Sequence, residues 1–78
     1  MKEFSERERQ IIKIIGRKKM TLEEISRDLF KEIDRFEGNI VVANSVTRII
    51  KKCTFHTLDW TLVKTRENNK LTIKKESL

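Results

Sequence analysis

Proline is absent from this 78-residue chain and glycine occurs only twice, which excludes long proline-rich or glycine-rich linkers. A single cysteine, Cys53, excludes a disulfide within the chain. A chain of this length forms one domain with a small core. We therefore expect a single domain over residues 1–78 that depends on side-chain packing for its stability.

The residues needed for several kinds of chemistry are also missing. His56 is the only histidine, and one cysteine with one histidine cannot complete a structural zinc site within one chain. No glycine-rich phosphate-binding loop is present. The sequence therefore predicts a protein that is not an enzyme and needs no metal or cofactor. The N-terminus has no apolar run suited to a signal peptide or a membrane span, so we expect a cytoplasmic, nucleoid-associated protein without membrane contact.

Charge is the most prominent feature that the chain does have. It contains 18 Lys and Arg against 12 Asp and Glu, giving a formal net charge of +6 and a pI near 9.8. After Gly38, eight basic residues face only three acidic ones: Asp59, Glu67 and Glu76. A basic bias of this size in one small domain favours polyanionic partners, and it places the contact surface in the C-terminal half.

Two helices are predicted in the first half of the chain. The first covers about residues 5–15, since Ser5 and Glu8 have the spacing of a capping box and Gly16 suits a helix end. The second covers about residues 21–36, and Thr21 and Glu24 form the same cap. Apolar residues recur at helical spacing along it, namely Leu22, Ile25, Leu29, Ile33 and Phe36.

A third helix is predicted over about residues 44–54, with Asn44 or Ser45 as its N-cap. The apolar segment before it is ambiguous, and in an alternative interpretation this helix already begins at Ile40. One face would carry the apolar residues Val46, Ile49, Ile50 and Cys53. The opposite face would carry Ser45, Thr47, Arg48, Lys51 and Lys52. Because Cys53 lies on the apolar face, we expect a buried structural thiol.

A β-hairpin is predicted over about residues 60–75. Trp60, Leu62, Leu71 and Ile73 can share its inner face, and Asn68-Asn69 suits a two-residue turn because asparagine tolerates positive φ. Residues 76–78 would form a frayed tail. The predicted fold class is mostly α with a β-hairpin (α+β), with three helices followed by a two-stranded unit.

Three helices followed by a basic-tipped hairpin resemble the winged helix-turn-helix family of small prokaryotic, archaeal and phage regulators. The run Asn44-Ser45-Val46-Thr47-Arg48-Ile49-Ile50 is similar to the recognition helix of that family, and Thr21-Leu22-Glu23-Glu24-Ile25 is similar to the helix that supports it. The resemblance implies a DNA-binding protein that acts as a small transcriptional regulator. Its third helix would enter the major groove, while the hairpin would contact the backbone or the minor groove.

The side chains assigned to DNA by this hypothesis lie on the third helix and on the hairpin. They are Asn44, Ser45, Thr47, Arg48, Lys51, Lys52, Lys64, Arg66, Asn68, Asn69 and Lys70. Double-stranded DNA is the expected partner, and a homodimer would suit a palindromic site. In the alternative interpretation the domain binds a polymerase or another regulator, so its partner is a protein. RNA binding is less favoured, because the sequence lacks an aromatic platform for unpaired bases.

Overall fold

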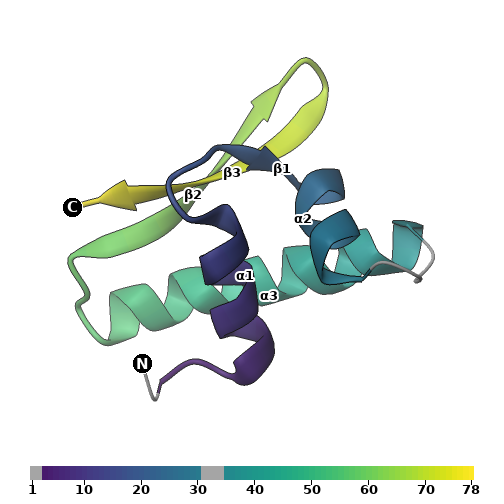
Figure 1. Cartoon of the computed structure of the whole chain (residues 1–78). Helices are drawn as coiled ribbons and strands as arrows, with labels where there is room; N and C mark the ends of the chain where they lie inside the picture. Colours follow the sequence, from purple (N-terminus) through teal and green to yellow (C-terminus); the bar gives the residue numbers. More distant parts are fainter. Residues whose placement is uncertain (1–2, 31–34) are drawn as a thin grey trace.

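The computed structural model describes residues 3–30 and 35–78 as an α+β fold with three helices and a three-stranded antiparallel sheet. The elements are α1 (Glu6–Ile15), β1 (Met20–Thr21), α2 (Leu22–Leu29), α3 (Arg35–Phe55), β2 (Trp60–Glu67) and β3 (Lys70–Ser77). The strand order is β1-β3-β2. Figure 1 shows the helices on one side of this sheet, with the long helix α3 crossing behind α1.

The two predicted capping boxes and the predicted stop of the first helix are confirmed. The Glu8 N–H donates to Ser5 Oγ at 3.2 Å, and the Ser5 N–H donates back to Glu8 Oε1 at 2.8 Å. Thr21 and Glu24 make the same reciprocal pair at the start of α2. Gly16 ends α1 with a φ of 54°, a conformation that costs a residue without Cβ little. These ends formed as predicted because each depends only on residues three or four positions apart.

The predicted boundaries of the second and third helices are wrong. The helix α2 ends at Leu29, where Phe30 leaves the helical conformation, and it does not continue to residue 36. The helix α3 begins at Arg35, earlier than either Asn44 or Ile40. Phe36 therefore belongs to α3, and Ile33 of the predicted apolar stripe lies outside the described residues.

Packing between α2 and α3 explains why the third helix begins so early. Gly38 is buried inside α3 at the point where Ser26 of α2 comes close, and a Cβ at Gly38 would lie 2.2 Å from Ser26 Oγ. One turn later, Val42 is fully buried. A glycine inside a helix costs about 1 kcal/mol relative to alanine, but here it lets the two helices approach closely enough to bury their apolar residues. A local sequence pattern could not predict this stabilisation, because it comes from contacts between two different helices.

The core lies between the helices and the inner face of the sheet. Its buried apolar residues are Phe4, Ile11, Ile12, Ile15, Ile25, Val42, Val46, Ile49, Cys53, Leu62 and Ile73. Cys53 is buried as expected, and burial raises the pKa of its thiol. Trp60 is half-buried at the edge of the core, with its ring centroid 5.9 Å from that of Phe4 and the Lys75 Nζ 4.7 Å above it.

The predicted hairpin is confirmed and is longer than expected. Asn68 and Asn69 both have positive φ, at 50° and 63°, as a tight two-residue turn requires. The strand β3 continues to Ser77, and the Leu78 N–H donates to the Asp59 carbonyl at 2.8 Å, so the expectation of a frayed tail is wrong. The sequence analysis also missed β1, which pairs with β3 through Met20–Ile73 and Thr21–Thr72.

The end of α3 is closed by Thr57 in a conformation that usually belongs to glycine. Thr57 has a φ of 49°, its N–H donates to the Thr54 carbonyl, and the Leu58 N–H donates to the Cys53 carbonyl. These two bonds are those of a Schellman motif, in which the left-handed position favours glycine. The β-branched threonine is strained in this position.

We predict that Thr57→Gly stabilises the domain by about 1 kcal/mol, because glycine relieves this strain. The melting temperature should rise by roughly 4–8 °C in a domain of this size. Thermal unfolding followed by circular dichroism measures the shift. The control is Thr54→Gly, which places glycine in the last turn of α3 and should lower the melting temperature. A lower melting temperature for Thr57→Gly would contradict the assignment of strain.

Candidate nucleic-acid interface

One face of α3 points away from the core and is here called the outer face of α3. It consists of residues spaced three or four apart, namely Ile40, Asn44, Thr47, Lys51 and Phe55. Asn44 and Lys51 are exposed, and Thr47 is half-buried. Ile40 is 46% exposed and Phe55 is 81% exposed. The outer face therefore combines an amide, a hydroxyl and an ammonium group with two accessible apolar side chains.

Two of the predicted DNA contacts, Arg48 and Lys52, are held by Glu8 of α1. Glu8 is only 1% exposed. Its Oε1 accepts from Lys52 Nζ at 2.7 Å, and its Oε2 lies 3.5 Å from Arg48 Nε. Burial raises the pKa of the Glu8 carboxyl, but hydrogen bonds from Lys52 and from the Ser5 backbone N–H outweigh burial and hold the pKa below its ordinary value of 4.5. The carboxylate therefore compensates part of the positive charge of α3.

Ser45 does not lie on the outward face of the helix, so this part of the prediction is wrong. Its side chain is 0% exposed, and its Oγ accepts from Arg48 Nη2 at 3.2 Å. The reason is helical spacing, because Ser45 lies three positions after Val42 and four before Ile49 and shares their buried stripe. Ser45 thus orients Arg48 from beneath and cannot reach a ligand at the surface.

Lys64 connects the sheet to the outer face of α3. It is exposed on β2, and its Nζ lies 3.4 Å from Thr47 Oγ1. The same Thr47 hydroxyl donates to the Ala43 carbonyl at 3.1 Å. The contact brings the ammonium group of a strand next to the middle of the helix, so α3 and β2 form one continuous polar surface.

The tip of the hairpin extends this polar surface with further exposed side chains, namely Arg66, Asn68, Asn69 and Lys70. At the same tip, Glu67 accepts from Lys19 at 2.7 Å and so compensates the charge of the connection between α1 and β1. Arg66 and Lys70 make no salt bridge within the part of the chain that the structure describes. The net charge of the tip therefore remains positive.

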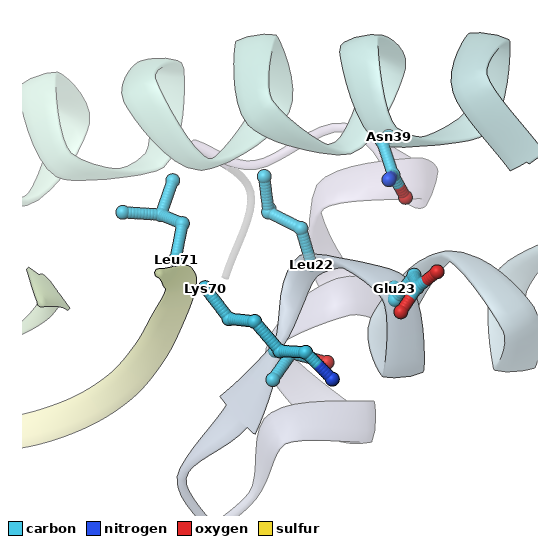
Figure 2. A pocket seen from close by; sticks show the side chains of 6 residues that line it. Leu22, Glu23, Asn39, Lys70 and Leu71 are labelled. Atoms are coloured by element: carbon cyan, nitrogen blue, oxygen red, sulfur yellow. The ribbon is translucent and has the colours of Figure 1, made fainter. Parts of the chain in front are cut away.

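A shallow pocket lies where the hairpin meets the helices, and the sequence analysis did not predict it. It is lined by Thr21, Leu22, Glu23, Asn39, Lys70 and Leu71. Figure 2 shows Leu22 and Leu71 pointing toward α3, while Asn39 points from α3 toward α2. The Oδ1 atom of Asn39 is buried and accepts no hydrogen bond from the described residues. No sequence signal indicated this pocket, because Asn39 lies between the predicted second and third helices and so had no predicted helix face.

The predicted site residues thus fall into three groups. Eight are surface residues of α3 and the hairpin that no carboxylate among the described residues holds, namely Asn44, Thr47, Lys51, Lys64, Arg66, Asn68, Asn69 and Lys70. Arg48 and Lys52 are held by Glu8, and Ser45 is buried. Within residues 3–30 and 35–78, no group of three His, Cys, Asp or Glu side chains could hold a metal ion.

Two further searches, one for membrane-spanning helices among the described residues and one for known relatives, gave no positive result. None of the described helices has both the length and the apolar composition needed to cross a bilayer. Comparisons with protein-family models, with curated proteins and with solved structures found no match. What this surface does must therefore be argued from its own residues.

Proposed function

We propose that this protein binds double-stranded DNA and acts as a small transcriptional regulator. In this proposal the outer face of α3 enters the major groove, which is wide enough for a helix, and the hairpin β2–β3 follows the backbone or the minor groove. Three helices followed by a hairpin with a basic tip support the resemblance to winged helix-turn-helix regulators. The net charge of +6 supports a polyanionic partner.

The observation that carries the proposal is the contact between Lys64 and Thr47, with Nζ and Oγ1 3.4 Å apart. It joins the cations of the hairpin, Arg66 and Lys70, to Lys51 of the helix across one surface. A helix with polar tips beside a row of cations offers both contacts that DNA needs, namely base edges for the amide and phosphates for the cations. Arg48 adds a guanidinium whose side chain is still 56% exposed.

A fluorescence-anisotropy titration on a random double-stranded DNA tests the proposal. If Lys51, Lys64, Arg66 and Lys70 each neutralise one phosphate, log Kd should rise with log salt with a slope of about 3.6 between about 50 and 200 mM salt. Binding should be measurable at the lower concentration. Absence of binding even there would overturn the proposal.

Single substitutions test which cations take part. Lys51→Ala and Lys64→Ala should each reduce the salt slope by about one and weaken binding to all sequences similarly. Lys13→Ala is the matched control, because it removes the same charge from an exposed position on α1. If Lys13→Ala weakened binding as much as the other two, net charge alone would explain the affinity and the assigned surface would be wrong.

The second candidate function is a protein-interaction module, and Phe55 is the observation that favours it. Its ring is 81% exposed at the end of α3, and it stacks edge-on against His56 at a centroid distance of 5.0 Å. An exposed aromatic ring offers an anchor for contact with a polymerase, another regulator or a second copy of this chain, since a few large side chains carry most of the binding energy of protein interfaces. Sedimentation analysis of wild type and Phe55→Ser tests whether the partner is a second copy of this chain. A homodimer that forms through Phe55 should sediment as a monomer in the variant.

A further inference from the structure

We propose that the first half of α3 gives this protein a preference for A·T base pairs, with Asn44 reading adenine and Ile40 contacting the methyl group of thymine. The inference rests on the proposed DNA binding and adds the class of DNA sequence that is bound. It depends on which side chains of the helix remain available after the internal contacts of the fold are accounted for.

Within one helical turn of Asn44, the side chains that could read guanine, or that could serve either base, already make contacts inside the fold. Arg48, the residue type that most often pairs with guanine, donates to Ser45 Oγ at 3.2 Å and pairs with Glu8 at 3.5 Å. The Thr47 hydroxyl donates to the Ala43 carbonyl and lies 3.4 Å from Lys64 Nζ. Ser45 itself is fully buried. None of these groups is free to select a G·C pair without losing an internal contact.

Asn44 is the available hydrogen-bonding side chain on this part of the helix. It is exposed, and its amide makes no hydrogen bond within residues 3–30 and 35–78. An asparagine amide presents a donor and an acceptor side by side, which match N7 and the N6 amino group of adenine in the major groove. Guanine presents two acceptors at these positions, so it satisfies only half of the amide.

Ile40 supplies an apolar contact one helical turn before Asn44. It is 46% exposed although it is β-branched and apolar, and it lies on the same outer face. Four residues advance the helix by about 6 Å, roughly two base-pair steps. The thymine C5 methyl is the one apolar group at the major-groove edge, so an exposed isoleucine at this distance from Asn44 favours a thymine close to the adenine.

A set of matched short duplexes tests the inference by anisotropy. One duplex contains mixed A·T pairs, a second replaces thymine by uracil, a third replaces A·T by inosine·cytosine, and a fourth replaces A·T by G·C. Wild type should bind the A·T duplex roughly tenfold or more tightly than the G·C duplex, and removing the thymine methyl should weaken binding a few-fold. Inosine·cytosine resembles G·C in the major groove and A·T in the minor groove. Because Asn44 and Ile40 would read the major groove, the protein should bind the inosine·cytosine duplex as weakly as the G·C duplex.

Two variants assign the preference to its residues. Asn44→Ala should bring the ratio between the A·T and G·C duplexes close to one, and Ile40→Ala should abolish the difference between thymine and uracil. Lys13→Ala should keep both ratios. Equal binding to A·T and G·C duplexes, or an A·T preference that inosine·cytosine also satisfies, would overturn the inference while DNA binding stands. A preference that persists in Asn44→Ala would also overturn it. Binding to none of the duplexes would instead overturn the proposed function.

Discussion

Glu8→Ala is expected to lower the free energy of unfolding by about 2–4 kcal/mol. The substitution removes the acceptor for the Ser5 N–H and the buried partner of Lys52, and losing one member of a buried pair costs about 3–5 kcal/mol. The lower end of our range reflects the exposure of the partners, since the side chains of Lys52 and Arg48 are 35% and 56% exposed and can be hydrated again. Urea denaturation measures the loss.

Glu24→Ala is the matched control for this prediction. Glu24 occupies the same position in the capping box of α2, with Thr21 N–H donating to its Oε1 at 2.9 Å, but it is exposed. Its loss should therefore be small. If Glu24→Ala cost as much as Glu8→Ala, the cap and not the contact between α1 and α3 would explain the effect.

The same carboxylate predicts the response of the protein to acid. Because the folded-state pKa of Glu8 is below its unfolded value, its contribution to stability is fully present above about pH 4.5 and is lost as the pH falls through the folded-state pKa. Glu8→Gln keeps an acceptor for Ser5 but cannot titrate. We expect its stability to change less than that of wild type between about pH 5 and pH 3.

Gly38→Ala is expected to lower the free energy of unfolding by about 1–3 kcal/mol despite the better helix propensity of alanine. The added Cβ would lie 2.2 Å from Ser26 Oγ, so α2 and α3 would have to separate. Urea denaturation of the purified variant measures the effect.

Ser26→Ala supplies the second half of a double-mutant cycle. In the double variant the nearest Ser26 atom to the new Cβ is its own Cβ at 3.6 Å, an ordinary van der Waals distance. We therefore expect Ser26→Ala to recover most of the stability that Gly38→Ala loses. Additive losses in the double variant would contradict the close approach of α2 and α3 at this point.

Local sequence signals predicted the parts of the fold that depend on neighbouring residues. The caps at Ser5 and Thr21, the stop at Gly16 and the turn at Asn68–Asn69 all follow from contacts within four positions along the chain. The boundary between α2 and α3 could not be predicted in the same way. That boundary depends on the close packing of Gly38 against Ser26, and these two residues are twelve positions apart in sequence.

The candidate site was predicted only in part for a related reason. Glu8 was assigned to a cap, although it continues the buried stripe of Ile11, Ile12 and Ile15 at helical spacing. Ser45 likewise lies three positions after the fully buried Val42. A polar residue at an apolar stripe position is therefore the signal that could have identified both. The pairing of Arg48 with Glu8 had no local signal, since the two residues are forty positions apart.

An NMR titration with a short double-stranded DNA tests the central claim most directly. Our account predicts that the side-chain amides of Asn44, Asn68 and Asn69 and the backbone amides of the outer face of α3 shift together as DNA is added at low salt. The chemical shifts of the backbone amides around Lys13 in α1 should not change. No shifts, or shifts confined to α1 or to the surroundings of Phe55, would contradict the assignment of α3 and the hairpin to DNA.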